Sequence, residues 1–112
     1  MPNHLISLEE AVNLTTTYQA EKDSLLCEEY QGRNILPVCE TFDRADIDTL
    51  LAQEGCVGLR IYLGMDNNAL VKVVLVGVDA NNDDLLDADN SIIVEMGRRC
   101  PVDCPNPSPL NS

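Results

Sequence analysis

The stretch that most constrains the fold is the run 69–78, with the sequence ALVKVVLVGV. Apolar residues occupy both odd and even positions, and Lys72 is the only charged residue within it. A strand of this kind is buried on both faces, so it lies in the middle of a sheet with a helix against at least one side. We therefore predict a central strand over 69–78.

A second strand precedes this run. Residues 57–63 alternate between apolar and other side chains, which predicts a strand with one buried face. The apolar positions are Val57, Leu59, Ile61 and Leu63. The segment 64–68, GMDNN, is rich in turn-forming residues, so the two strands form an antiparallel hairpin. A shorter strand is expected over 37–41, and residues 91–96 form either a further strand or a helical turn.

Two helices complete the expected domain. Ser7 and Glu10 have the spacing of a capping box, and the apolar periodicity that follows predicts a helix over 8–22. Asp43 is a second N-cap, and Gly55 is the stop signal after a helix over 44–53. The predicted fold class is α+β, with two helices packed on a small, mainly antiparallel sheet of three to four strands in one domain, residues 1–96.

Residues 97–112 form a proline-rich tail, GRRCPVDCPNPSPLNS. Proline fixes φ and removes backbone donors, so neither a helix nor a central strand continues through such a segment. An extended tail of this kind loses little entropy when it docks. Leu110 is its natural apolar anchor, and Arg98 and Arg99 are its basic pair.

The tail also carries Cys100 and Cys104, whose spacing suits either a disulfide or a soft metal such as zinc. Cys27, Cys39 and Cys56 each lie next to apolar residues, and we expect them in the core. Five cysteines leave at least one unpaired within a single chain.

The acidic loop 79–90, DANNDDLLDADN, resembles a calcium-binding loop. Its oxygen ligands would be Asp79, Asn81, Asp83 and Asp87. Asp84 stands where such loops have glycine, and Asn90 where they have a bidentate glutamate. The pattern therefore favours a solvated turn in which Asp and Asn bond to their own backbone.

The charge balance disfavours several partners. Nineteen acidic and seven basic residues give a net charge of −12, which repels nucleic acid and anionic membrane surfaces. No apolar run is long enough to span a bilayer, and the chain shows no targeting segment, so we expect a cytoplasmic protein. No phosphate loop, serine elbow or zinc-protease motif occurs, and His4, the single histidine, lies in the N-terminal extension.

Three segments together resemble a group of small uncharacterised proteins from Bacteroidetes. These are Gly58-Leu-Arg-Ile-Tyr62, Leu75-Val-Gly-Val-Asp-Ala-Asn81, and the Cys-Pro-x-x-Cys tail that ends in Pro109-Leu-Asn-Ser112. The resemblance covers about residues 55–112 and the Ile6-Ser-Leu-Glu-Glu start. It implies no particular activity.

Two functional hypotheses follow. In the first, the protein is a non-catalytic interaction module whose tail docks on a protein partner, on a second copy or on its own domain, and it needs no cofactor. In the second, it is a small metal-binding or thiol-redox protein that uses Cys100 and Cys104.

Overall fold

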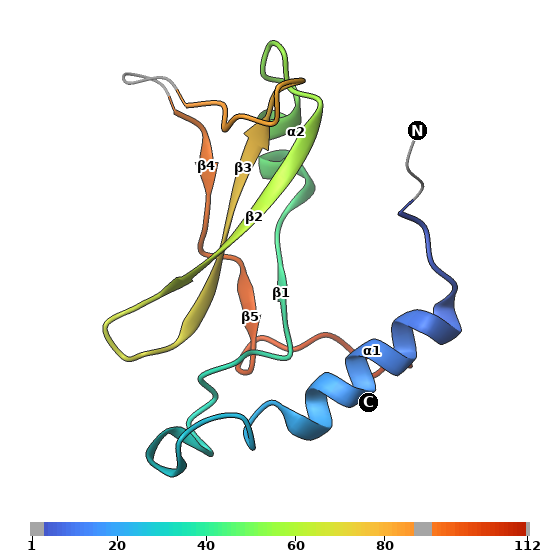
Figure 1. The fold of residues 1–112 in the computed structure, drawn as a ribbon, viewed down its shortest axis with the longest axis vertical. Coiled ribbons are helices and arrows are strands. Elements are labelled where there is room, and N and C mark those ends of the chain that lie inside the picture. Colours follow the sequence, from blue (N-terminus) through green and yellow to red (C-terminus); the bar gives the residue numbers. More distant parts are fainter. Residues whose placement is uncertain (1–3, 87–90, 112) are drawn as a thin grey trace.

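The computed structural model describes residues 4–86 and 91–111 (Figure 1). Its described elements are α1 (Leu8–Glu21), the short 3-10 helix η1 (Glu28–Tyr30), β1 (Cys39–Thr41), α2 (Arg44–Leu51), β2 (Gly58–Met65), β3 (Val71–Val78), β4 (Ile93–Val94) and β5 (Arg98–Cys100). One antiparallel sheet has the order β2-β3-β4, and β1 and β5 pair separately as a two-stranded ribbon. The predicted α+β class is confirmed.

The β2–β3 hairpin is the one that the sequence predicts. Its register pairs Gly58 with Val78 at one end and Met65 with Val71 at the other. β3 is the central strand of its sheet, and the Leu75 side chain in its second half is buried. The strand expected over 91–96 is present only as the short β4.

On its edge away from β2, the backbone of β3 forms hydrogen bonds with several different segments. Near its end, the Leu85 amide donates to the Gly77 carbonyl over 2.9 Å. In its middle, Leu75 pairs with Val94 of β4. These partners occupy the backbone groups of the second half of β3, which would be costly to leave unpaired in the core.

Beyond the end of β4, two side chains form hydrogen bonds with the backbone of β3. The Val73 amide donates to Glu40 Oε1 at 3.0 Å, and Arg99 Nε donates to the Val71 carbonyl at 3.1 Å. The Val71 amide donates to the Ile35 carbonyl at 2.8 Å. The first half of β3 is therefore held on this edge by side chains of the β1–β5 ribbon and by the segment before β1.

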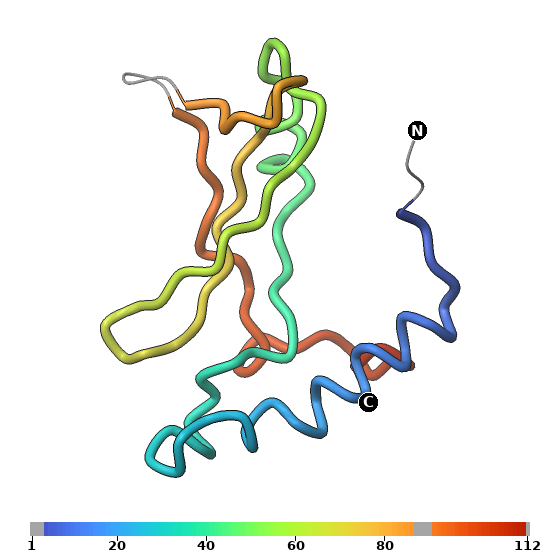
Figure 2. Tube along the Cα trace, in the orientation of Figure 1, coloured from blue at the N-terminus to red at the C-terminus, as the bar shows by residue number. Residues whose placement is uncertain are grey.

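One strand of this ribbon, β5, lies inside the predicted tail. β5 pairs with β1 so that Cys100 faces Cys39, and the two strands run side by side (Figure 2). Gly97 permits this approach, since a Cβ there would lie only 2.8 Å from the Phe42 ring. The folded part of the chain thus extends to residue 100, beyond the expected end at 96, because the first tail proline is Pro101.

α2 packs against β3 and β4. Its Leu50 is fully buried, and Gly77 of β3 leaves room for Cys56, whose Sγ would lie 3.0 Å from a Cβ at that position. Asp43 occupies the predicted N-cap position, but its side chain makes no capping hydrogen bond. Its Oδ1 instead lies 3.7 Å from a guanidinium nitrogen of Arg98.

α1 begins with the predicted capping box, in which the Glu10 amide donates to Ser7 Oγ at 3.0 Å. None of its side chains is buried. The Tyr18 hydroxyl donates to the Pro37 carbonyl, and Gln19 Nε2 donates to the Leu110 carbonyl at 2.9 Å. α1 therefore lies along the tail and the segment that leads to β1 (Figure 1).

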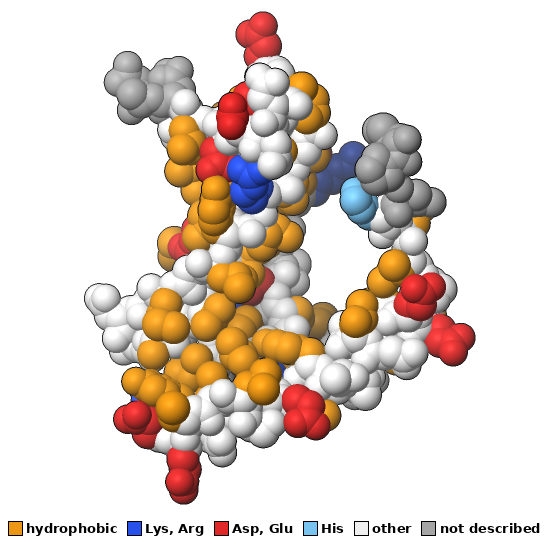
Figure 3. All heavy atoms as spheres, in the orientation of Figure 1, with side chains coloured by type: hydrophobic (Ala, Val, Ile, Leu, Met, Phe, Trp, Pro, Cys, Tyr) orange, Lys and Arg blue, Asp and Glu red, His pale blue; other side chains and the backbone are white. Residues whose placement is uncertain are grey.

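The described chain buries few large side chains and exposes many. The buried apolar residues are Ile35, Leu50, Leu75, Val76 and Cys100. The radius of gyration is 16.0 Å, against about 13 Å for a compact chain of this length. Apolar side chains are visible over much of the surface in Figure 3.

Two burial predictions are wrong. The alternation in β2 predicts one buried face, yet Leu59, Ile61 and Leu63 are 40%, 59% and 76% exposed. Cys27 is predicted in the core, yet it is exposed, and Cys39 and Cys56 are only half-buried. Periodicity identifies an apolar face, but it does not say whether another element covers that face. No helix among the described residues is both long and apolar enough to cross a membrane.

Candidate functional site

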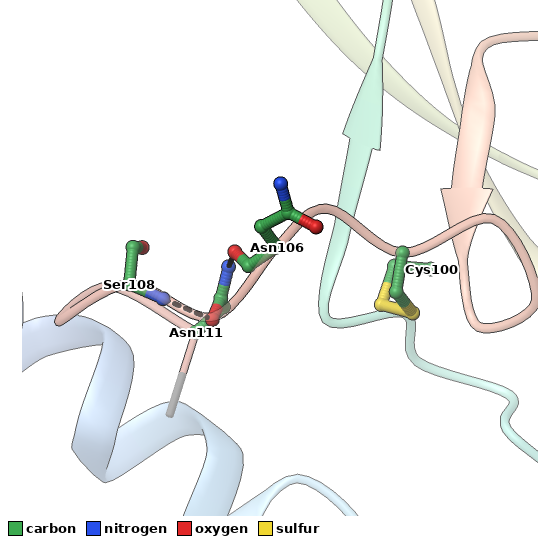
Figure 4. The surroundings of a disulfide bond; sticks show 5 residues. Cys100, Asn106, Ser108 and Asn111 are labelled. Carbon is green, nitrogen blue, oxygen red and sulfur yellow. Dashed lines mark hydrogen bonds between the residues drawn. A yellow bond between two sulfur atoms is a disulfide. The ribbon is translucent and has the colours of Figure 1, made fainter.

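The tail closes on itself through a disulfide between Cys100 and Cys104, whose Cα atoms are 4.5 Å apart (Figure 4). Cys100 is buried at the end of β5, whereas Cys104 is exposed. The Asp103 amide, within the closed loop, donates to the carbonyl of Arg99, the residue before Cys100, at 2.9 Å. In this oxidised form the two sulfur atoms are bonded to each other and offer no thiolate to a metal.

Beyond the disulfide the tail folds into a turn. The Ser108 amide donates to Asn111 Oδ1 at 2.9 Å, and Asn111 Nδ2 donates to the Asn106 carbonyl at 3.1 Å (Figure 4). The turn presents the Leu110 carbonyl to Gln19 of α1. The tail is thus attached to the rest of the chain at β5 and again at α1.

The predicted interaction residues lie in different surroundings. Arg99 is half-buried, and its guanidinium donates to the carbonyls of Asn34, Ile35 and Val71. Arg98 is exposed on the other face of the ribbon. The Leu110 side chain is 41% exposed.

Cys39 is a third cysteine at this site, and sequence reasoning placed it in the core instead. It is the register partner of Cys100. Residues that face each other across an antiparallel pair project from the same face. Glu40 and Arg99, the next pair along, reach toward β3, so Cys39 and Cys100 lie on the opposite face of the ribbon. The long sequence separation leaves no local signal for this pairing.

The acidic loop forms a turn where the structure describes it. Asp79 Oδ1 accepts the amides of Asn81 and Asp83 at 2.9 and 3.0 Å. Asp87, the fourth predicted calcium ligand, lies outside the described residues. Among the residues that are described, no group of three His, Cys, Asp or Glu side chains is placed to hold a metal ion.

Asp84 has a different role from its acidic neighbours. The Tyr62 hydroxyl donates to its Oδ2, and Arg60 donates to its Oδ1, each at 2.5 Å. These hydrogen bonds, that of Tyr62 foremost, stabilise the carboxylate and hold the pKa of Asp84 below its ordinary value. A second Arg60 nitrogen donates to the Asn82 carbonyl at 2.9 Å. The loop is thereby attached to β2.

Comparisons with protein-family models, with curated proteins and with solved structures find no match for this chain.

The Asp84 carboxylate gives a pH-dependent prediction. Because its pKa is lower in the folded chain, its stabilising effect is complete above the unfolded pKa of about 4 and is lost as the pH falls through the folded value. We expect Asp84→Asn to lower the urea midpoint at neutral pH, and the difference from the wild type to shrink below about pH 4.

Asp83→Asn is the matched control, because the Asp83 side chain is exposed in the same loop. It should change the urea midpoint little at either pH. A gap between Asp84→Asn and wild type that stays constant down to low pH would show that the carboxylate charge is not what stabilises the loop.

Proposed function

We propose that this protein is a small non-catalytic protein-interaction module whose tail docks on its own domain. The observation that carries the proposal is the total surface that the chain exposes, on which many large apolar side chains lie. The chain exposes 8207 Å², whereas a compact monomer of 12.3 kDa exposes about 6,100 Å². The excess of about 2,100 Å² is larger than the roughly 800 Å² that one partner contributes to a standard interface.

The net negative charge of the chain disfavours some classes of partner. The net charge of −12 disfavours nucleic acid and anionic lipid, so a protein surface is the partner that fits the exposed apolar residues. We also propose that the protein acts in the cytoplasm. There the Cys100–Cys104 disulfide would form only transiently.

Methionine oxidation tests the interaction role. Met65 and Met96 are 66% and 85% exposed, so peroxide should oxidise both in dilute purified protein almost as fast as in the urea-unfolded chain. In a native extract of cells that make the protein, we expect a bound partner to slow both reactions several-fold. Peptide mass spectrometry gives the two rates, and equal rates in extract and buffer would contradict the proposal.

Docking of the tail is tested by removing residues 105–112. An isolated helix as short as α1 is marginal in water, and α1 buries no side chain, so its stability depends on contacts such as Gln19 with Leu110. We expect amides of α1 to exchange about fivefold faster, the equivalent of one hydrogen bond of about 1 kcal/mol.

Gln19→Ala should act in the same direction in the full chain, whereas Thr16→Ala, at an exposed position of the same helix, should not. Hydrogen exchange read by mass spectrometry measures all three variants. Unchanged exchange in the truncated chain would mean that the tail does not dock on α1.

A thiol function is the second candidate, and the position of Cys39 favours it. The Cys39 thiolate would attack Cys100 Sγ, a Cys39–Cys100 disulfide would form, and Cys104 would leave as a thiolate that takes up a proton. The exchange consumes one disulfide and makes one, so it needs no external oxidant. Residues that face each other in antiparallel strands have Cα separations within the range of disulfides. The zinc alternative finds no comparable support in the described residues.

Disulfide mapping under non-reducing conditions tests this candidate. Oxidised wild-type protein left at mildly alkaline pH should contain both the Cys100–Cys104 and the Cys39–Cys100 linkage. Cys39→Ser should contain the first alone, and Cys27→Ser, which removes an exposed thiol elsewhere, should behave as wild type. Full alkylation of Cys39 with no Cys39–Cys100 peptide in the wild type would eliminate the candidate.

A further inference from the structure

β2 is an open edge of the three-stranded sheet. In an antiparallel pair, alternate residues direct their backbone groups toward the partner strand and away from it. Val71 and Val73 of β3 bond on the side away from β2. Their register partners are Met65 and Leu63, which therefore direct their own amides and carbonyls away from β3. By the same alternation Ile61 and Leu59 do so too.

The residues that line this edge are also the exposed apolar ones. Leu59, Ile61, Leu63 and Met65 are 40%, 59%, 76% and 66% exposed. Natural proteins protect an exposed edge with proline, with lysine or with an inward-pointing charge, and β2 contains no proline and no lysine. Its one charged residue, Arg60, is held by Asp84 and Asn82. We name Leu59, Ile61, Leu63 and Met65 the β2 edge.

We propose that two copies of this chain associate by antiparallel pairing of their β2 edges. Ile61 of each copy would face Ile61 of the other, and Leu59 of each would face Leu63 of the other. All the outward backbone groups of these residues would then be paired, and the two sheets would join into one of six strands. The proposal rests on the proposed function, because it names the partner of an interaction module.

A second copy fits this edge for two reasons. Antiparallel pairing of a strand with itself obeys a two-fold axis, so a single surface supplies both sides of the interface. The pairing also places apolar side chains opposite apolar side chains. The four residues of the β2 edge are uncharged, so the pairing brings no like charges together along this edge.

The net charge of −12 on each copy opposes association, and this repulsion gives the dimer a characteristic dependence on salt. At about 0.15 M salt the screening length is roughly 8 Å. Surface charges farther apart than this interact weakly, whereas the apolar and backbone contacts of the β2 edge do not depend on screening. The dimer should therefore form at physiological ionic strength.

Sedimentation equilibrium of the purified full-length chain tests the proposal. We expect the wild type to approach twice the 12.3 kDa chain mass as its concentration rises. Leu63→Lys places a charge on the β2 edge at a position that is 76% exposed, so the single chain should still fold. It should weaken dimerisation at least about tenfold, which corresponds to about 1.4 kcal/mol.

Leu14→Lys is the matched control, since Leu14 is 66% exposed on α1 and lies outside the β2 edge. It should dimerise as the wild type does, and circular dichroism should show the same fold for all three proteins. A wild type that stays monomeric, or a Leu63→Lys variant that dimerises as tightly as Leu14→Lys, would overturn the proposal.

Amide exchange followed by NMR tests the register without any substitution. The amides of Leu59, Ile61 and Leu63 should exchange slowly only at concentrations where the dimer forms. Those of Arg60 and Tyr62, which face β3, should exchange slowly at all concentrations. A dimer in which both sets behave alike would exclude pairing through β2.

The outcomes also separate this proposal from the proposed function. A chain that is monomeric in solution, yet protected at Met65 and Met96 in cell extract, would overturn the self-pairing and leave the interaction role standing. A chain that dimerises through β2 when purified and concentrated, but shows no protection of Met65 or Met96 in extract, would support the self-pairing and overturn an interaction at cellular concentration.

Discussion

The guanidinium of Arg99 is the group on which the arrangement of the sheet, the ribbon and the N-terminal half most depends. It donates to the carbonyls of Asn34, Ile35 and Val71, so one side chain joins β5, the segment before β1 and the first residue of β3. Hydrogen bonds from a charged donor are stronger than neutral ones, and the half-buried position limits competition from water. With Glu40 at Val73, these contacts replace the strand that β4 is too short to provide. The start of the tail is therefore part of the fold and holds it together.

The local elements could be predicted from the sequence because each has a local cause. The capping box of Ser7 and Glu10 predicts where α1 begins, and the two-faced apolar run predicts a central β3. The pairing of β1 with β5 could not be predicted, because it joins segments far apart in the chain and β5 lies next to prolines. The exposure of Ile61 and Leu63 on β2 could not be predicted either, because the alternation is the same whether another layer covers the apolar face or leaves it open.

At the candidate site, too, some features could be predicted from the sequence and others could not. The spacing of Cys100 and Cys104 admitted a disulfide, and the structure contains one. No spacing indicated Cys39, since only the register of the ribbon brings it opposite Cys100. In the acidic loop, Asp83 and Asp84 are adjacent and chemically identical. Only the placement of Arg60 and Tyr62 on β2 makes Asp84 the one that attaches the loop to the sheet.

The small core and the open β2 edge have a common physical origin. A chain of this length contains enough apolar side chains for a compact core, but here they are distributed over a three-stranded sheet, a separate ribbon and a helix that lies on the tail. α1 buries no side chain and the apolar side chains of β2 are largely exposed, so apolar area remains in water at a cost of about 25 cal/mol per Å². Pairing at β2 would remove part of that cost and satisfy the outward backbone groups of β2 at the same time. Under the proposed pairing, association would add to the stability of the folded chain, because a second copy would cover surface that the single chain leaves open.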